Sequence, residues 1–317
     1  MQLRSLSLFL AGLLLAGCRT PSSSLRIGAN VWPGFEPLFL AHSLGYYDGQ
    51  PIRLVDFPSS AEIIRAYRNR AIDIAAVTAD EALQVTEKLS GQRIVLVCDF
   101  SNGADVILTK PHFPSMKDLY GRRIGVEQNA LGAYTLARAL EISGMKAGDI
   151  IVVPVPLEEH ESAYAADQVD AVVTFEPRRT RLLAAGARQV FDSSQIPGEI
   201  VDVLLTRQEL VEADGDTLTA LVHGWFRSLD YLRRHPQDAA RRLAPREQVR
   251  PEDFLQSLQG LELPDHAANL RLLGRSTGSL EGALRRLQTV MIQNQLLSRT
   301  QDVAVLLDDR IVRKGAP

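Results

Sequence analysis

The sequence contains few of the residues on which whole classes of protein depend. Its 317 residues include only two cysteines, Cys18 and Cys98, which are too few for a disulfide framework. Basic residues are not in excess, because 35 Lys and Arg stand against 38 Asp and Glu, a formal net charge of −3. A nucleic-acid-binding protein normally carries a basic surplus, so we expect no nucleic-acid partner.

Catalytic motifs are missing as well. The chain has no Gly-x-Ser-x-Gly elbow, no Walker phosphate loop and no His-Glu-x-x-His helix. Cys98 ends an apolar run and is expected to be a small buried hydrophobe rather than a nucleophile. The six histidines lack the spacing of metal ligands; they are His42, His112, His160, His223, His235 and His266. The sequence therefore predicts no enzyme, no metal site and no cofactor.

The N-terminal residues have the layout of a secretion signal. An apolar run from Leu6 to Leu15 follows the basic Arg4 and is too short to span a membrane. The Leu-Ala-Gly-Cys tetrad at 15–18 resembles the bacterial lipobox, in which Cys18 becomes the lipidated N-terminus. We expect a signal peptide over 1–17, a lipidated flexible tether over 18–24, and anchoring at the periplasmic face of the cell envelope. A plain signal peptide with a chance cysteine is the alternative.

From Leu25 onward, short β-branched runs alternate with longer helical patterns, which predicts an α/β fold with largely parallel sheets. The expected strands are 25–29, 52–57, 72–77, 94–99, 105–109, 123–126, 150–154 and 171–175. The expected helices between them are 36–44, 61–69, 79–89, 131–143, 159–166 and 178–185. After about Thr206 only helices are expected, at 218–233, 237–243, 251–259, 267–273 and 280–298. A Pro-containing stretch at 110–118 divides the strands into two sets, which indicates two lobes with a ligand cleft at the strand ends.

The most distinctive motif follows the first expected strand. Residues 30–37 read Asn-Val-Trp-Pro-Gly-Phe-Glu-Pro, in which Pro33 and Gly34 favour a turn and Pro37 suits a first helical turn. Trp32 and Phe35 would then stand at the carboxyl end of the strand, where two aromatic rings can form the wall of a ligand site. The alternative is that both rings only pack the turn.

This motif resembles that of the periplasmic binding proteins of the nitrate/sulfonate/taurine type, a group that includes binding proteins for thiamine-pyrimidine precursors. The likeness continues in the family's order over most of the chain. It includes Leu-Ala-x-x-x-Gly-Tyr-Tyr at 40–47, Asp-Ile-Ala-Ala-Val-Thr at 73–78, Asn-Gly-Ala-Asp at 102–105, Met-Lys-Asp-Leu-x-Gly-Arg-Arg-Ile-Gly-Val-Glu at 116–127, Thr-Phe-Glu-Pro at 174–177 and Asp-Ser-Ser-Gln-Ile-Pro-Gly at 192–198.

The resemblance implies a type II periplasmic-binding-protein fold, with two α/β lobes, a hinge and a C-terminal helical segment. Lobe 1 would comprise 25–107 and 205–317, lobe 2 would comprise 108–204, and the crossings near Thr109 and Leu204 would form the hinge. The lobes would close around a small solute. The resemblance also implies a monomeric substrate-binding protein that serves the separate permease and ATPase of an ABC importer.

Two other functions stay open. One is a ligand-sensing lipoprotein that signals without transport. The other is an enzyme of the same superfamily, the pyrimidine synthases, although this chain lacks the cysteine-rich motif that those enzymes carry.

The expected site departs from the sulfonate pattern. No hydroxyl occurs between Glu127 and Tyr134, whereas sulfonate binders present hydroxyls at this helix start, and the expected strand ends carry acids but no Arg or Lys. A carboxylate beside a sulfonate is costly, so we predict a nitrogen-containing ligand with N–H donors, or a cation. The alternatives are a sulfonate, nitrate or taurine ligand, with acids such as Asp80 serving as helix caps. The predicted ligand-binding residues are Asn30, Trp32, Phe35, Thr78, Asp80, Asp105, Glu127, Gly132, Tyr134, Glu176 and Asp202.

Overall fold

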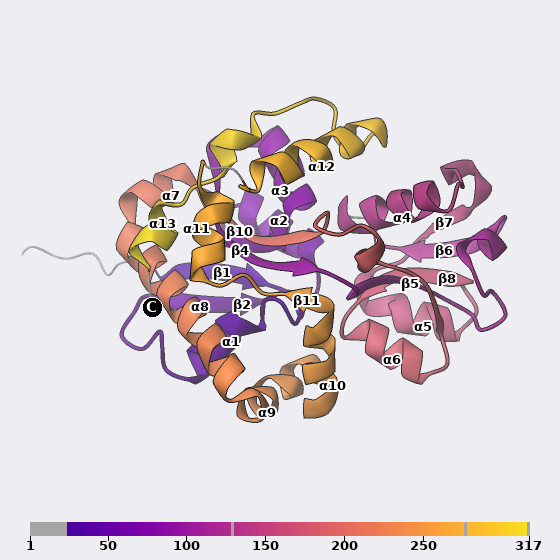
Figure 1. The fold of residues 1–317 in the computed structure, drawn as a ribbon, viewed down its shortest axis with the longest axis horizontal. Coiled ribbons are helices and arrows are strands. Elements are labelled where there is room, and N and C mark those ends of the chain that lie inside the picture. Colours follow the sequence, from indigo (N-terminus) through magenta and orange to yellow (C-terminus); the bar gives the residue numbers. More distant parts are fainter. Residues whose placement is uncertain (1–23, 128–129, 276–277, 316–317) are drawn as a thin grey trace, which may run out of the picture.

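The computed structural model describes residues 24–127, 130–275 and 278–315. The predicted signal peptide and the predicted lipidation site Cys18 lie outside the described residues. The described chain forms two lobes side by side, each built around one β-sheet that is covered by helices on both faces (Figure 1). Within the described residues, no helix combines the length and the apolar character needed to cross a bilayer.

The first lobe contains a six-stranded sheet with the order β11-β4-β10-β3-β1-β2. Its strands are β1 (Leu25–Ala29), β2 (Ile52–Asp56), β3 (Ile74–Thr78), β4 (Gln92–Ser101), β10 (Val201–Arg207) and β11 (Leu261–Glu262). Its helices are α1 (Glu36–Ser43), α2 (Ser60–Arg68), α3 (Ala79–Lys88), α7 (Gln208–Ala213), α8 (Gly215–Arg234), α9 (Pro236–Glu247), α10 (Pro251–Ser257), α11 (His266–Leu273), α12 (Glu281–Gln293) and α13 (Arg310–Lys314). Short 3-10 turns lie at Leu258–Gly260 and Val303–Leu306.

The second lobe contains a five-stranded sheet with the order β7-β6-β8-β5-β9. Its strands are β5 (Asp105–Thr109), β6 (Arg123–Val126), β7 (Ile151–Pro154), β8 (Ala171–Phe175) and β9 (Arg188–Asp192). Helix α4 (Ala130–Ile142) covers one face, and α5 (His160–Ala165) and α6 (Arg178–Ala184) cover the other (Figure 1). Short 3-10 turns lie at Met116–Leu119, Ala147–Asp149, Leu157–Glu159 and Ser193–Gln195.

The same polar clamp holds the parallel strands of both lobes. In the first lobe, the backbone N–H and the guanidinium of Arg26 both donate to Asp73, at 2.9 and 2.8 Å. In the second lobe, Arg123 does the same to Asp170, at 2.9 and 3.2 Å, and each pair is 47 residues apart. Each Arg lies near the start of a central strand and each Asp directly precedes the neighbouring parallel strand. The two lobes therefore repeat one βαβαβ arrangement, and their strand ends face each other in equivalent positions.

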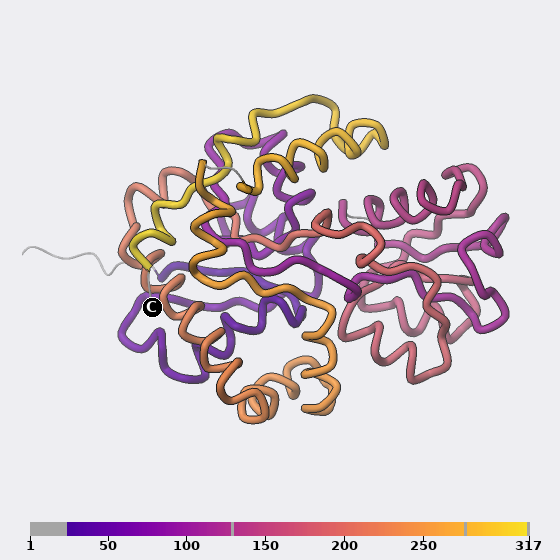
Figure 2. The backbone as a smooth tube through the Cα atoms, in the orientation of Figure 1, coloured from indigo at the N-terminus to yellow at the C-terminus, as the bar shows by residue number. Residues whose placement is uncertain are grey.

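Two chain segments connect the lobes, at 102–104 and 193–200 (Figure 2). They meet at Ser193, whose Oγ lies 2.8 Å from Ser101 Oγ and accepts the N–H of Gly103 at 2.7 Å. Gly103 has a φ of +116°, a backbone conformation that side chains disfavour. These buried serine contacts fix the place where the two sheets join.

The fold class predicted from the sequence is confirmed, but three of its details change. Strand β5 pairs wholly within the second sheet and β10 wholly within the first, so the crossings do not lie at Thr109 and Leu204. Both sheets are mixed rather than largely parallel, because β10 runs antiparallel to β3 and β4 and β5 runs antiparallel to β8. The region after Thr206 also contains one short strand, β11, which pairs with β4.

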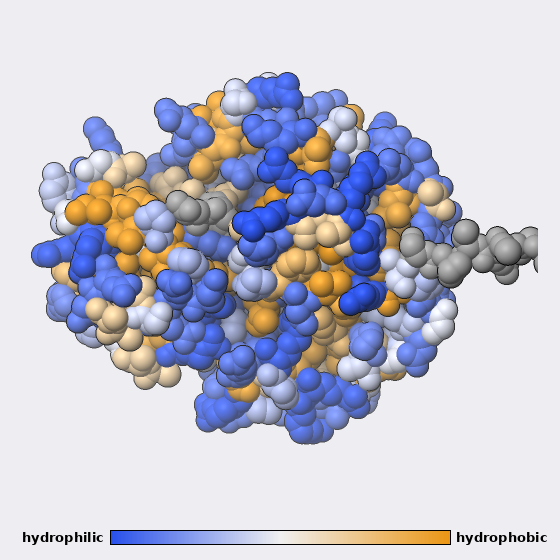
Figure 3. Space-filling view, turned by 180° about the vertical axis from the view of Figure 1, so that it is seen from behind, coloured by the Kyte–Doolittle hydropathy of each residue, from blue (hydrophilic) through white to orange (hydrophobic). Residues whose placement is uncertain are grey.

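The surface of the molecule is mixed in character. Seen from behind, most of it is hydrophilic, with scattered hydrophobic areas over both lobes (Figure 3). In the first lobe, the apolar face of α8 is turned inward, because Trp225, Leu229 and Leu232 are all buried. The packing that the helical pattern predicts for this segment is therefore present.

Candidate functional site

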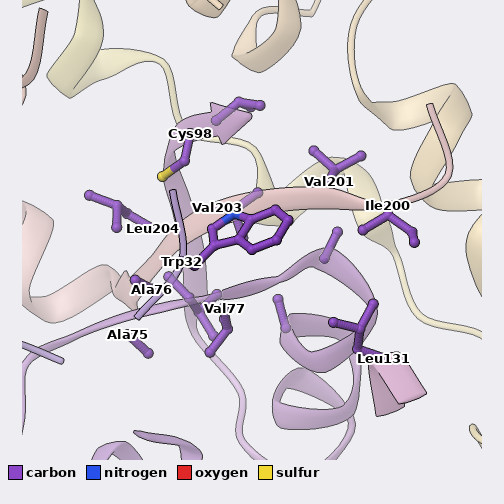
Figure 4. Packing of buried hydrophobic residues seen from close by; sticks show 14 of the residues in the cluster. Trp32, Ala75, Ala76, Val77, Cys98, Leu131, Ile200, Val201, Val203 and Leu204 are labelled. Atoms are coloured by element: carbon purple, nitrogen blue, oxygen red, sulfur yellow. The ribbon is translucent and has the colours of Figure 1, made fainter. Parts of the chain in front are cut away.

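The loop after β1 forms the floor of a site between the lobes. The N–H of Phe35 donates to the carbonyl of Trp32 at 2.9 Å, which closes the turn that Pro33 and Gly34 favour. The indole of Trp32 lies among Val77, Val203 and other buried side chains of the first sheet (Figure 4). Its Nε1 donates to Asp99 Oδ2 at 3.1 Å. This hydrogen bond restrains the ring, whose centroid lies 5.6 Å from that of Phe175 in the second lobe.

Gly34 is required by this arrangement. A Cβ at position 34 would lie 1.8 Å from Asp99 Oδ2 and 2.4 Å from Trp32 Nε1, which are impossible contacts. The turn approaches Asp99 closely because the side chain at position 34 is absent. The Trp-Pro-Gly segment of the motif therefore has a physical explanation: it brings an indole N–H onto a buried carboxyl group.

A cavity of about 20 Å³ lies at this point. A space of this size holds about one water molecule, so a solute with several non-hydrogen atoms requires the lobes to move apart before they close on it. The first lobe contributes most of the lining, and Asp105, Leu131 and Phe175 come from the second. The lining residues are Asn30, Trp32, Phe35, Ser60, Val77, Thr78, Glu81, Asp105, Leu131, Phe175 and Asp202.

The cavity lies where the carboxyl ends of strands meet, as the sequence predicts. Six of the predicted residues line it: Asn30, Trp32, Phe35, Thr78, Asp105 and Asp202. The sequence analysis did not select the other five lining residues, which also lie near a helix start or a strand end: Ser60, Val77, Glu81, Leu131 and Phe175. That these residues contact a solute stays a prediction.

The central pair of acids is Asp99 and Asp202. They are directly opposite each other on the antiparallel strands β4 and β10, and both are buried, at 0% and 4% exposure. Burial raises the pKa of Asp99 to about 7, against the effect of the Trp32 hydrogen bond, which lowers it. Burial and the charge of Asp99 together raise the pKa of Asp202 well above its usual value. The pair therefore holds a proton near neutral pH.

Asp99 was not predicted as a site residue. The signal for it was present, since it is an acid within the apolar run of β4, where a charge is unexpected unless it is partnered.

Other acids surround this pair. Burial raises the pKa of Asp105 to about 7, that of Asp80 to about 6 and that of Glu81 to about 8. Thr78 is the N-cap of α3 and forms a capping box with Glu81, whose Oε2 accepts the N–H of Thr78 at 3.2 Å. Asp80 is therefore not the cap residue that the alternative prediction made it; it lies in the first turn, buried, and does not line the cavity.

Four other predicted residues lie outside the lining. Glu176 is fully buried, but its Oε1 accepts from Arg179 at 2.8 Å and its Oε2 accepts the N–H of Thr180 at 3.1 Å. Glu176 therefore accepts hydrogen bonds at the start of α6 and does not line the cavity, where the sequence analysis placed it. Tyr134 donates to Glu199 at 2.5 Å, beside the second crossing, and Gly132 is buried within α4.

Glu127 directly follows β6, in the position that Asn30 occupies after β1. It is 7% exposed, and burial raises its pKa to about 7 although the charge of Arg178 opposes this shift. Arg178 begins α6, directly after β8 and Pro177. The expectation that no basic residue stands near these strand ends is therefore wrong in one place, where Arg178 is balanced by Glu127, Glu158 and Glu161.

In the part of the chain that the structure describes, no group of three or more His, Cys, Asp or Glu side chains is arranged to hold a metal ion.

Two α/β lobes joined by two crossings, with a cavity lined from both, define a periplasmic binding protein. The chain belongs to the NMT1-like family, whose model matches residues 19–246. The sequence-based recognition of a nitrate/sulfonate-type binding protein is thereby confirmed at the level of family and fold.

Individual relatives agree with this assignment. The alkanesulfonate-binding protein SsuA from Xanthomonas axonopodis pv. citri is similar with a TM-score of 0.74 and 19% identity over 90% of this chain and 96% of that one. The desulfurization enzyme DSZB is similar with a TM-score of 0.70 and 17% identity over 92% and 98%. At these identities the likeness shows the fold alone. A binding protein of Brucella abortus is 32% identical over 88 residues, which span only 28% of this chain and 28% of that relative.

Proposed function

We propose that this protein is the substrate-binding component of an ABC importer and captures a small, polar, nitrogen-containing solute between its lobes. The observation that carries the proposal is the cavity itself, since Trp32 and Asp202 line it from the first lobe and Asp105 and Phe175 from the second. A solute that touches both lobes makes contacts that exist only when they close, so it favours the closed state.

The lining supports a nitrogen-containing solute over an anion. Asp105 and Asp202 are buried acceptors, and Lys and Arg are absent from the lining residues. A sulfonate or nitrate would be placed beside these acids without an offsetting cation, at a considerable cost. N–H donors on the solute would instead pair with them. The similarity to SsuA keeps a sulfonate, nitrate or taurine ligand as the second candidate.

The family supports a role in an ABC importer, and the predicted lipobox at 15–18 supports attachment to the membrane. Members of this type deliver solute to a separate membrane permease and its ATPase, so both are the proposed partners of this chain. Lipidation of Cys18 would hold the protein at the periplasmic face of the membrane through the tether at 18–24. A lipoprotein that senses the same solute and signals without transport would use the same site.

Binding rather than catalysis is supported by the chemistry of Cys98. DSZB shows that this fold also hosts an enzyme. Here the Cys98 thiol is fully buried, and burial together with the charges of Asp99 and Asp202 raises its pKa well above the usual value. The thiolate is the nucleophilic form, so Cys98 is poorly suited to attack a substrate.

Solute binding and lobe closure are tested together. Amines, pyrimidines, sulfonates and nitrate are screened for those that raise the melting temperature, because a bound solute stabilises the folded state by mass action. Small-angle scattering then compares the radius of gyration with and without the best compound. We expect a smaller radius with solute. A compound that binds while the radius stays constant would contradict capture by closure.

A further inference from the structure

We propose, as a refinement that rests on the solute-binding function above, that the solute is a small organic cation. The carboxyl groups of Asp105 and Asp202, which line the cavity, take up this cation in exchange for a proton held between Asp202 and Asp99, which lies outside the lining. The proton leaves to solvent, and no covalent bond forms or breaks other than the O–H bond of the carboxylic acid. The inference names the charge of the solute and the residues that select it.

The exchange is centred on the pair of Asp99 and Asp202. The two residues are opposite each other on neighbouring strands and nearly inaccessible, and Asp99 Oδ1 is buried without a hydrogen-bond partner within the described residues. Two charges at this distance repel, whereas one shared proton turns the contact into a hydrogen bond. The Trp32 N–H already donates to Asp99, so Asp202 is the member that retains the proton. A nearby cation would favour its release.

Asp105 supplies an unpaired acceptor that lines the cavity. It is 3% exposed and lines the cavity, and its Oδ2 has no hydrogen-bond partner within the described residues. An orphaned buried carboxyl oxygen is costly, and a donor that enters the cavity would satisfy it. Asp105 is also directly opposite Phe175 in the second sheet, while Asp202 belongs to the first. A cation between these two acids therefore holds both lobes.

The groups that surround the three acids are mostly acids themselves. Asp80 and Glu81 approach from α3, and Cys98 from β4. Glu176 and Glu127 follow β8 and β6; the first is paired with Arg179 and the second faces the charge of Arg178. Asp99, Asp105 and Asp202 form no ion pair within the described ranges, and the cavity lining contains no Lys or Arg. Positive charge next to these three acids must therefore come from protons or from the solute.

The aromatic lining selects an organic cation over a metal ion. Trp32, Phe35 and Phe175 supply ring faces and edges beside the acids. Aromatic faces attract ammonium and guanidinium groups, and they also cover the carbon skeleton of the solute. A metal ion would instead require additional oxygen ligands in place of rings.

The sign of the pH dependence separates a cation from an anion. A cation competes with protons for the carboxyl groups, so its affinity rises as the pH increases from about 6 to 8, by up to about tenfold per unit if one whole proton is displaced. An anion is repelled by the carboxylates that form over this range, so its affinity falls. A neutral N–H donor that needs no proton release shows little change.

The experiment uses the purified protein and a defined panel. The cations are ethylammonium and guanidinium, the neutral N–H donor is acetamide, the anions are ethanesulfonate and nitrate, and Ca²⁺ and Mg²⁺ represent metals. Compounds that raise the melting temperature are measured by calorimetry near pH 6, 7 and 8. Two buffers of different ionisation enthalpy are used at each pH, which gives the number of protons released. We expect an organic cation to bind best and to release up to one proton.

Three Asp→Asn variants identify the residues involved. Asp105→Asn should weaken cation binding by about ten- to a hundred-fold, the value of a charge-assisted hydrogen bond. Asp202→Asn, which keeps a donor toward Asp99, should abolish most of the proton release and flatten the pH dependence. Asp230→Asn is the matched control, because Asp230 is 52% exposed on α8 and pairs with Arg234; it should change neither quantity.

Each other outcome has a definite meaning. If an anion, a metal ion or acetamide binds best, the solute is not an organic cation, although the solute-binding function stands. Cation binding without proton release and with constant affinity from pH 6 to 8 overturns the exchange. If no compound of the panel raises the melting temperature, the solute-binding function fails together with the inference.

Discussion

The ring of Trp32 meets the ring of Phe175 edge-on across the boundary between the lobes, with centroids 5.6 Å apart and planes at 87°. Trp32 follows β1 in the first lobe and Phe175 ends β8 in the second. Opening the cleft must break this contact, and the same two rings line the cavity. One aromatic pair thus contributes both to closure and to the wall of the proposed site.

Replacing Phe175 should weaken closure. Phe175→Leu removes an edge-to-face contact of about 0.5–1.5 kcal/mol, so the affinity for the solute should fall by roughly two- to tenfold. The melting temperature without solute should change little, because Phe175 is only half-buried. Calorimetry measures the affinity. Phe39→Leu is the control, since Phe39 is a half-buried ring that packs within the first lobe; equal losses in both variants would argue against a specific role for Phe175.

Stability without solute should fall as the pH rises. The folded pKa values of Asp99 and Asp105 are raised from the usual 3.8 to about 7, so the folded state binds more protons than the unfolded state between these values. The extra stability is complete below about pH 4 for these groups and is lost as the pH approaches 7. Urea unfolding of the protein near pH 5, 6, 7 and 8 should show a decreasing free energy of unfolding over this window.

The contribution of the acid pair to that trend can be isolated. Asp202→Asn keeps a donor facing Asp99 but cannot ionise, so its free energy of unfolding should decline less between pH 5 and 8 than that of the wild type. Asp230→Asn, an exposed site on α8, should retain the wild-type slope. If the free energy of unfolding of Asp202→Asn declines with pH as steeply as that of the wild type, the Asp99–Asp202 pair does not bind the proton responsible for the trend.

The sequence predicts the sheet edge at which the site lies better than it predicts the contacts of individual side chains. Strands β1, β5, β6 and β8 have the predicted bounds, because each is a short apolar run with turn residues at its end. Strand β10 was missed, although it lies at the centre of the first sheet. Its partners β3 and β4 are about a hundred residues away in sequence, and local periodicity carries no information about such pairing.

The same limit explains which site residues were misplaced. The expectation that ligand-binding residues follow the carboxyl ends of strands places Glu176 and Tyr134 near the cleft. The direction of each side chain, however, depends on partners that are close only in the folded structure. Arg179 lies one helical turn from Glu176, and Glu199 reaches Tyr134 from the second crossing. Asp99 was missed because its pairing with Asp202 is visible only in the antiparallel register of β4 and β10.

Lipidation should depend on Cys18 alone. Cys18→Ser removes the thiol to which a diacylglycerol group would attach, so labelled fatty acid should no longer enter the protein and the protein should leave the membrane fraction. Cys98→Ser is the matched control, because Cys98 is fully buried in β4; this variant should still incorporate label. A wild-type protein that takes up no label would show that the tetrad at 15–18 is not a lipobox.

Arg181 should act as a latch between the lobes. It lies on α6 in the second lobe, and its Nη1 donates to the carbonyl oxygen of Glu247, at the end of α9 in the first, at 3.1 Å. A carboxylate of the second lobe, Glu161, holds the guanidinium in place at 2.7 Å. Arg181→Gln should therefore favour the open state, and a lost hydrogen bond of about 0.5–1.5 kcal/mol should weaken solute binding roughly two- to tenfold. The radius of gyration without solute should increase.

Arg123→Gln is the control, because Arg123 makes a similar bidentate pair with Asp170 inside one lobe and should alter stability without changing the radius. If both variants leave the radius and the affinity equal to those of the wild type, the Arg181 contact does not hold the lobes together.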